Sequence, residues 1–386
     1  MKTILNICLT GPYSDGFAYQ DNLLPKYQRR LGHRVVVIAP AWRWSRDGSL
    51  EHIVPSRYAD KDGVEIVRIE NDQGKSVEYR FKTYRELKAL LLEYAPDIIF
   101  LHGLQIRDSA TVARYVRKHS GVRLFVDNHA DESNSATNWL SKNVLHRVVW
   151  KHYAKILEPL TEMFWGVLPA RVDFLVKYYG VPRKKCDLLV MGADDDEVAR
   201  ASNPSVCKLI RARLGFSADD FVVVTGGKID PAKTQTFLLM DAVRSLGGRT
   251  KLLVFGPVDP ALQGEFDCRR EDGRIVYVPW ADSSESYDYF ATADAVCFPG
   301  RHSVYWEQAA AMGKPLIVKR WRGTEHVDIC GNVIFLDKDS ADEIRAAIIK
   351  VSLEKGIEGG MYGCARDAAK HFLYSDIARR SIGFSG

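Results

Sequence analysis

Residues 221–225 read FVVVT, and the next eight residues, 226–233, read GGKIDPAK before a pattern of helical period begins near Thr234. A short β-branched run that ends in glycines and leads into a helix is typical of a strand–loop–helix unit in a parallel sheet. Units of the same kind recur on both sides of this stretch. We therefore predict an α/β fold with two parallel sheets and crossover helices.

Two series of such units are visible. The first gives expected strands at residues 4–9, 34–39, 97–102 and 123–127, and the second at 221–225, 251–255, 275–278, 295–298 and 315–318. Between them, residues 192–205 (GADDDEVARASNPS) are rich in Asp, Asn, Ser and Pro, as in an interdomain connection. We expect domains at residues 1–195 and 196–370 and a helical tail at 371–386, whose packing the pattern leaves open.

Composition narrows the class of protein. The 386 residues are 46% hydrophobic and 27% charged, which indicates a soluble protein of more than one domain. The net charge of +5 is small and dispersed, so we expect no nucleic-acid partner. The seven cysteines are an odd number without metal-ligand spacing, which favours a reducing, cytoplasmic location and no structural zinc. No run approaches the roughly 18 apolar residues of a membrane span, so any membrane contact is peripheral.

The loop at residues 226–233 has the residues of a phosphate site. Gly226 and Gly227 allow close approach of the backbone, and Lys228 and Lys233 flank a turn at a helix start, where the dipole also favours anions. On residue types alone, there is an alternative to a phosphate site: Lys228 and Lys233 could be two solvated surface lysines around a turn.

A second loop follows the strand at 295–298. Residues 299–315 read PGRHSVYWEQAAAMGKP, a loop that enters a short Ala-rich helix. Glu307 lies in the first turn of that helix, where a carboxylate can bind a ribose diol or simply interact with the helix dipole.

The Lys228-x4-Lys233 spacing and the EQAAAMGKP stretch resemble the carboxyl-terminal half of retaining glycosyltransferases of family 4. This resemblance implies the GT-B architecture, two Rossmann-like domains with a cleft between them. It also implies a nucleoside diphosphate sugar as donor, bound by both lysines at its diphosphate and by Glu307 at its ribose. The acceptor would be a hydroxyl of a glycan or lipid-linked sugar. The implied setting is cell-envelope polysaccharide biosynthesis, with no metal or other cofactor.

The amino-terminal half resembles the same family more loosely. Residues 11–22 (GPYSDGFAYQDN), with Gly16, are similar to the glycine-containing loop that faces the donor, and residues 95–103 (APDIIFLHG) to a strand of the same domain. His129 in residues 127–131 (DNHAD) stands where the family has a histidine beside the donor sugar. The resemblance therefore implies that His129 orients the transferred sugar.

The family pattern is incomplete in this chain. The family has two glutamates eight residues apart, and here the first is missing, since Pro299 and Gly300 stand at that distance. The position five residues before Gly313 is Gln308 rather than a glutamate, so we expect Glu307 at the ribose and Gln308 as an additional polar contact. The shortened loop suggests His302 and Ser303 as sugar contacts.

Other stretches have weaker implications. Backbone amides of Gly323 and Thr324 are candidate phosphate donors, and Trp280 is expected in the core. The D-x-D pattern at 194–196 would suit a metal site in a different glycosyltransferase architecture, but a linker is favoured here. The basic, aromatic residues 142–155 could contact an anionic membrane, although their cations do not gather on one face of an ideal helix, which favours a half-buried core helix.

Two alternatives stay open. The missing glutamate suggests a nucleotide-sugar-binding scaffold without transfer activity, and a related two-lobed sugar-nucleotide epimerase would convert the donor without an acceptor.

Overall fold

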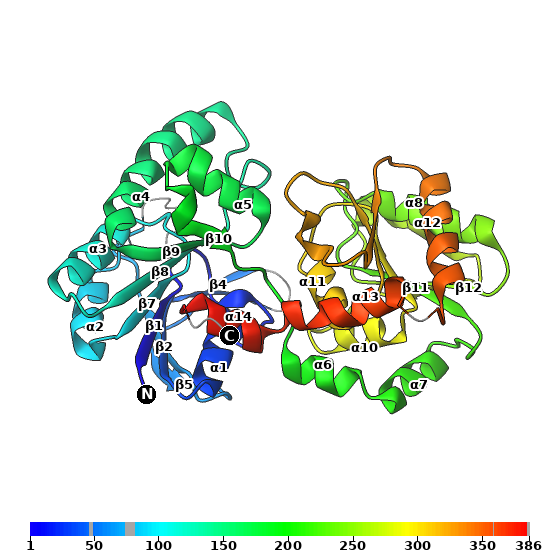
Figure 1. Ribbon diagram of the computed structural model, residues 1–386, viewed down its shortest axis with the longest axis horizontal. Coiled ribbons are helices and arrows are strands. Elements are labelled where there is room, and N and C mark those ends of the chain that lie inside the picture. The colour runs from blue at the N-terminus through cyan, green and yellow to red at the C-terminus, as the bar shows by residue number, and fades with distance from the viewer. Residues whose placement is uncertain (46–48, 74–81, 358, 384–386) are drawn as a thin grey trace. The chain divides into compact units, whose positions relative to one another are not determined.

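The computed structural model describes residues 1–45, 49–73, 82–357 and 359–383. The chain divides into two compact units (Figure 1). Unit 1 comprises Met1–Val190 and Tyr374–Gly386, and unit 2 comprises Met191–Leu373.

Unit 1 contains an eight-stranded sheet in the order β10-β9-β8-β7-β1-β2-β6-β5. All neighbouring strands are parallel except the edge strand β5, which is antiparallel to β6. Buried runs such as ILNI in β1 and VVVIAP in β2 explain why this sheet is covered on both faces. The strands are β1 (Thr3–Ile7), β2 (Arg34–Pro40), β5 (Arg57–Ala59), β6 (Glu65–Ile69), β7 (Ile98–Leu101), β8 (Arg123–Asn128), β9 (Thr161–Gly166) and β10 (Cys186–Leu188), with a separate hairpin of β3 (Trp42–Trp44) and β4 (Leu50–His52).

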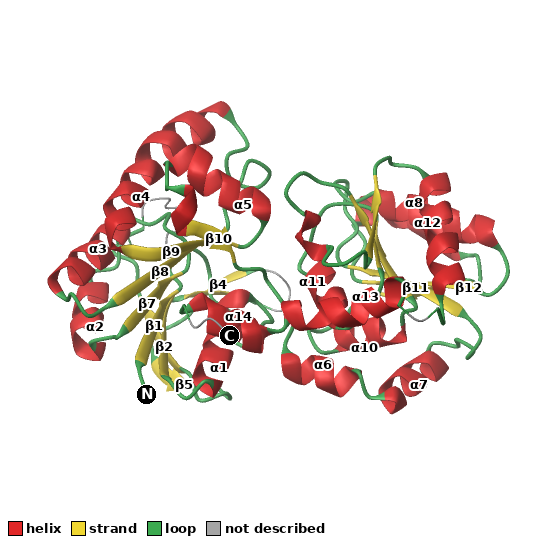
Figure 2. Ribbon diagram, viewed as in Figure 1, coloured by secondary structure: helices red, strands yellow, loops and turns green. Residues whose placement is uncertain are grey.

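Helices lie on both faces of this sheet (Figure 2). They are α1 (Gln20–Arg30), α2 (Glu86–Tyr94), α3 (Ser109–Lys118), the π-helical segment η1 (Ser141–Trp150) continuing into α4 (Lys151–Leu157), α5 (Pro169–Phe174) continuing into η3 (Leu175–Tyr179), the short turns η2 (Glu158–Leu160) and η4 (Arg183–Lys185), and α14 (Tyr374–Ser381).

Unit 2 contains a six-stranded, fully parallel sheet in the order β13-β12-β11-β14-β15-β16. The strands are β11 (Phe221–Gly226), β12 (Thr250–Phe255), β13 (Ile275–Val278), β14 (Ala295–Phe298), β15 (Leu316–Lys319) and β16 (Val333–Leu336). Because β11 lies between β12 and β14, the loops after these strands meet at one sheet edge, where ligands of such sheets bind.

The helices of unit 2 again cover both faces of its sheet (Figure 2). They are α6 (Asp195–Ala201), α7 (Pro204–Arg213), α8 (Gln235–Leu246), α9 (Gln263–Arg270), α10 (Glu285–Thr292), α11 (Tyr305–Ala311), α12 (Ala341–Glu354) and α13 (Met361–Ala368), with the turns η5 (Pro260–Leu262), η6 (Glu325–Val327) and η7 (Ala369–Phe372). The predicted fold class, two Rossmann-like α/β domains, is confirmed.

The stretch expected as an interdomain connection, residues 192–205, lies within unit 2 and is mostly helical. Asp194 caps α6 by accepting the Asp196 N–H at 3.1 Å, and Asn203 caps α7 by accepting the Ser205 N–H at 3.0 Å. The Asp, Asn, Ser and Pro residues of this stretch are therefore helix-start residues of unit 2. A capping role also accounts for Asp194 in the D-x-D pattern.

The chain crosses between units at Val190 and Met191 and returns at Leu373 and Tyr374. In the tail, α14 packs on α1, and the Ser381 carbonyl oxygen accepts a hydrogen bond from Trp165 Nε1 at 3.1 Å. The last three residues lie outside the described part of the chain.

Candidate functional site

The loop after β11 is held close to the loop after β12. Gly227 N–H donates to the Phe255 carbonyl and Ile229 N–H to the Pro257 carbonyl, both at 2.9 Å. A Cβ at Gly226 would come within 2.1 Å of the Phe255 ring, and Gly227 has φ of +103°. Both positions therefore require glycine, which leaves the loop backbone uncovered by side chains of its own.

One pocket of unit 2 is formed by this loop and the loop after β14. Thr236, in the first turn of α8, also lines it, so the positive end of the helix dipole lies at the pocket. The lining residues include five of the residues predicted from the sequence: Gly226, Gly227, Lys228, Lys233 and Ser303.

Arg301 lines the same pocket. This cation is not among the site residues predicted from the sequence, although its position beside His302 in the shortened loop was a signal. Within the described residues, Lys228, Lys233 and Arg301 have no ion pair, and no carboxylate lines the pocket. Three unpaired cations around two glycines form a site for an anion, and a diphosphate fits this charge.

Glu307 is fully buried at the start of α11. Its Oε1 accepts hydrogen bonds from Nε2 of His302 and Nε2 of His326, both at 2.8 Å. Burial alone would raise the pKa of Glu307, but the two histidines outweigh it and lower the pKa to about 2. Since Arg301 and Ser303 flank His302 in sequence, this cluster fixes the pocket loop and ties it to η6.

Two acceptors on α11 have no hydrogen-bond partner among the described residues. They are Oε2 of Glu307 and Oε1 of Gln308, and both are buried. A buried polar atom without a partner is costly, so a ligand with two donor groups would be stabilised here.

The Gly323–Thr324 amides are occupied within their own loop. Gly323 N–H donates to Glu325 Oε2 at 2.9 Å, and Thr324 N–H donates to the Trp321 carbonyl at 3.3 Å. Neither residue lines the pocket. Trp280 is 60% exposed, so its expected place in the core is wrong, because it lies in the loop after β13 rather than within a strand.

In unit 1, His129 follows β8 and is oriented by a buried carboxylate. Its Nε2 lies 3.1 Å from Oδ2 of Asp127, and His102 Nδ1 lies 3.2 Å from the same oxygen, while Oδ1 accepts the Gly103 N–H at 2.7 Å. Burial alone would raise the pKa of Asp127, but His129 and His102 lower it well below its ordinary value. Burial alone would lower the pKa of His102. Its interactions with Cys8 and Asp127 outweigh burial and raise the pKa well above its ordinary value.

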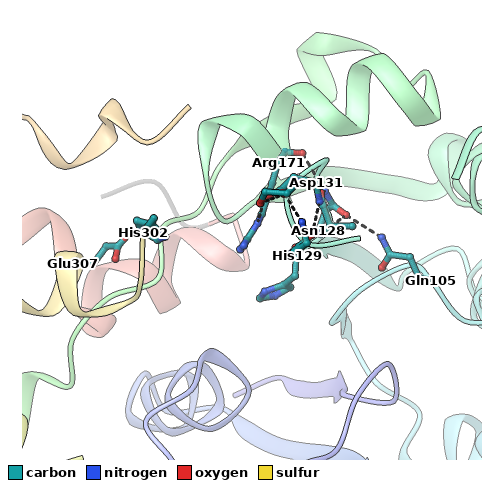
Figure 3. Close-up of polar contacts among 10 residues, drawn as sticks. Gln105, Asn128, His129, Asp131, Arg171, His302 and Glu307 are labelled. Carbon is teal, nitrogen blue, oxygen red and sulfur yellow. Dashed lines mark hydrogen bonds and ion pairs between the residues drawn. The ribbon is translucent and has the colours of Figure 1, made fainter. Parts of the chain in front are cut away.

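Hydrogen bonds around His129 hold its loop (Figure 3). Asn128 accepts from Gln105 Nε2 at 2.9 Å and donates to the Arg171 carbonyl at 3.1 Å. Arg171 Nε pairs with Asp131 at 3.1 Å. Asp127 holds Nε2 of His129, and the side chain of His129 is 39% exposed. The other ring nitrogen, Nδ1, is therefore available to a ligand.

Gly16 lies in an exposed loop with φ of +74°. The buried guanidinium of Arg68 holds this loop, donating to the Tyr13 carbonyl at 3.0 Å and pairing with Asp15 at 2.7 Å. Arg68 was not predicted from the sequence, since nothing in the strand that carries it, β6, marks a buried charge.

Among the described residues, three clusters bring metal-ligating atoms within 4.8 Å of one another: Cys8, Asp21 and His102; His102, Asp127 and His129; and His302, Glu307 and His326. In the third, His326 Nδ1 is buried without a described partner. A metal on His326 Nε2 would place the proton on Nδ1 and leave a buried N–H unsatisfied, so the histidine fits better as a donor to Glu307.

Part of the chain matches a known protein family. Residues 23–197 match the family model described as Glycosyltransferase Family 4. No curated protein matches the chain.

Solved structures match over nearly the whole chain. The HepE protein of Anabaena, in complex with UDP and glucose, has a TM-score of 0.65 at 14% identity, with 98% of each chain covered. Sucrose-phosphate synthase of Thermosynechococcus elongatus has a TM-score of 0.66 at 17% identity, covering 98% of this chain and 96% of that one. A putative UDP-N-acetylglucosamine 2-epimerase of Listeria monocytogenes has a TM-score of 0.62 at 11% identity, covering 98% and 94%. The chain therefore has the GT-B fold.

Proposed function

We propose that this chain, with the GT-B fold and an amino-terminal half similar to family 4, is a glycosyltransferase. It moves a sugar from a nucleoside diphosphate sugar to a hydroxyl of an acceptor glycan or lipid-linked sugar. The observation that carries the proposal is the pocket of unit 2, where Lys228, Lys233 and Arg301 surround Gly226 and Gly227 without a carboxylate.

The protein binds the donor at its diphosphate and at its ribose. Lys228 and Lys233 hold the diphosphate and stabilise the negative charge that grows on it as the sugar leaves. The partnerless oxygen atoms of Glu307 and Gln308 accept hydrogen bonds from the two ribose hydroxyls. His302 and Ser303, at the pocket loop, contact the sugar.

The transfer retains the anomeric configuration. The acceptor oxygen bonds to the anomeric carbon on the face from which the diphosphate leaves, the bond from that carbon to the phosphate oxygen breaks, and the departing diphosphate takes the acceptor proton. His129, held by Asp127, orients the sugar by a hydrogen bond. No enzymic nucleophile is required.

We propose that the reaction needs no metal. The three cations of the pocket supply the positive charge that a divalent ion provides in other phosphate sites. His326 Nδ1 has no described acceptor for the proton that a metal on Nε2 would place there, which argues against an ion at Glu307. Activity that survives a chelator would support this, and loss that Mg²⁺ or Mn²⁺ restores would contradict it.

The biological setting follows from the family resemblance. We place the enzyme in cell-envelope polysaccharide biosynthesis in the cytoplasm, peripherally on the inner face of the membrane where a lipid-linked acceptor is used. The complex of HepE with UDP and glucose favours a nucleoside diphosphate hexose as the first donor to try.

A sugar-nucleotide epimerase is the second candidate, because a putative epimerase shares the fold. One assay separates the classes. UDP-, GDP-, ADP- and CDP-sugars are incubated with and without glycan acceptors, and free nucleoside diphosphate and sugar configuration are followed by NMR.

A glycosyltransferase releases nucleoside diphosphate faster with acceptor and yields a product of the donor's anomeric configuration. An epimerase converts the sugar without release, and a scaffold binds the donor with neither transfer nor hydrolysis. The Lys233→Ala variant is the control that must lose transfer while staying folded.

A further inference from the structure

His102, which follows β7, has a buried ring nitrogen that forms no hydrogen bond. The side chain is 2% exposed, and its Nδ1 has no hydrogen-bond partner among the described residues. Two carboxylate oxygens nevertheless lie near this nitrogen, Oδ2 of Asp127 at 3.2 Å and Oδ1 of Asp21 at 3.5 Å. A buried nitrogen that faces two carboxylates indicates that a positive charge belongs among them.

A chain of buried hydrogen bonds fixes the role of the other ring nitrogen. The Ser381 hydroxyl donates to the Ala378 carbonyl at 2.7 Å, so it accepts from Nε2 of Gln28 at 3.2 Å. Gln28 Oε1 then accepts from Nδ2 of Asn6 at 2.8 Å, which leaves Asn6 Oδ1 facing Nε2 of His102 at 3.3 Å. An amide oxygen only accepts, so Nε2 of His102 carries a proton. Nδ1 is therefore the nitrogen that can offer a lone pair.

His129 adds a third ligand atom at the same carboxylate oxygen. Its Nε2 lies 3.1 Å from Oδ2 of Asp127, and one ligand atom each of His102, Asp127 and His129 lie within 4.8 Å of one another. Zinc bonds of about 2.0–2.1 Å place neighbouring ligands of a tetrahedron about 3.3 Å apart, close to the distances at Asp127. Because the His129 side chain is 39% exposed, an ion can enter from solvent and keep a water as its fourth ligand.

We propose that unit 1 binds Zn²⁺ through Nδ1 of His102, Oδ2 of Asp127 and Nε2 of His129. Two imidazoles and one carboxylate are a ligand set that zinc uses in proteins when it keeps an open position. A histidine that binds a metal usually donates its other N–H to an oxygen, as His102 does to Asn6. The second oxygen of Asp127 is also held, by the Gly103 N–H at 2.7 Å.

Unit 2 has a similar cluster that lacks this support. It consists of His302, Glu307 and His326, and the Nδ1 of His326 is buried without a described partner. A metal on His326 would leave a buried N–H unsatisfied, whereas the corresponding N–H of His102 has Asn6 as its acceptor. The two clusters have the same residue types, so the hydrogen bonds behind the ligands favour the one in unit 1.

Bound zinc replaces the proton that His102 otherwise holds between the carboxylates. It also occupies Nε2 of His129 and places the proton of that ring on Nδ1, so the nitrogen left to a ligand donates a hydrogen bond instead of accepting one. The ion therefore changes what His129 offers to a ligand. It takes no part in the sugar transfer proposed above.

The test is competition for Zn²⁺ between the full chain, first freed of metal, and a chromophoric chelator of known zinc affinity. We expect one zinc ion per chain and no displacement by a large excess of Mg²⁺, because imidazole ligands select zinc. His129→Ala and Asp127→Asn should each weaken zinc binding by at least about 100-fold. Loss of a hydrogen-bond partner behind a ligand already costs about 10- to 100-fold, and these changes remove a ligand itself.

His302→Ala is the matched control, because it removes a histidine from the cluster of unit 2, and it should bind zinc like the wild type. Circular dichroism of the metal-free variants checks their folding. NMR of the wild-type histidine rings needs no variant, and zinc should shift Nδ1 of His102 and Nε2 of His129. The proposal is overturned if the chain binds no zinc, if Mg²⁺ displaces it, or if zinc shifts other histidines instead. It is also overturned if folded His129→Ala and Asp127→Asn bind zinc like the wild type, or if only His302→Ala loses it.

Discussion

Replacement of Glu307 by Gln tests the buried cluster of Glu307, His302 and His326 beside the pocket. Glu307 is fully buried, and its carboxylate accepts from two histidines at 2.8 Å. Its pKa falls from an ordinary value of 4.5 to about 2 in the folded protein, which corresponds to about 3 kcal/mol of stability. We expect the variant to be less stable than the wild type by about this amount at neutral pH.

The sign of the pH dependence follows from the lowered pKa. The stabilisation is fully present above pH 4.5 and is lost as the pH falls toward about 2, because Glu307 is then protonated in the folded as well as in the unfolded state. The gap between wild type and variant should therefore be constant from neutral pH to about pH 5 and narrow below it.

Urea unfolding at a series of pH values measures this gap, and hydrogen exchange of peptides from α11 assigns it to unit 2. Glu265→Gln is the control, since Glu265 forms a solvent-exposed i,i+4 pair with Arg269 on α9. If Glu307→Gln kept wild-type stability and lost only nucleotide affinity, the hydrogen bonds from His302 and His326 would not stabilise the carboxylate. That result would refute the stabilising role of this cluster.

Three further changes test other parts of the account. Gly226→Ala should destabilise unit 2 by about 1–3 kcal/mol in urea unfolding, because its Cβ would come within 2.1 Å of the Phe255 ring, whereas Gly264→Ala, with open space, should be neutral. Asp127→Asn should lower kcat/KM by about 100-fold or more and alter its pH profile, since the histidine loses its orienting carboxylate, while nucleotide binding measured by calorimetry stays unchanged. Arg301→Gln should weaken nucleoside diphosphate binding roughly fivefold in the same calorimetry, a modest loss because Arg301 is exposed; an unchanged affinity would remove it from the site.

The sequence predicted the fold because its strands are short, apolar and regularly spaced. It also predicted the loop of Lys228 and Lys233, since local sequence alone sets glycines, cations and a helix start side by side. Residues 192–205 misled because helix caps and linkers use the same residue types. The capping bonds of Asp194 and Asn203 distinguish the two only in the structure.

Contacts between distant loops lay beyond sequence reasoning. His326 meets Glu307 across 19 positions of the chain, and Asp127 joins His102 to His129 inside unit 1.

The central claim is that unit 2 binds the diphosphate of a nucleotide sugar through Lys228 and Lys233. The most direct measurement is a thermal-shift series of wild type and Lys233→Ala with UDP, GDP, ADP, CDP and their common sugar conjugates, each with and without a chelator. A ligand at about 100 times its dissociation constant adds about 2.7 kcal/mol of stability, which is readily measured. The account predicts that one nucleoside diphosphate and its sugar conjugate stabilise the wild type regardless of chelator and that the shift is lost in Lys233→Ala. Stabilisation by none of them, or an equal shift in the variant, would contradict it.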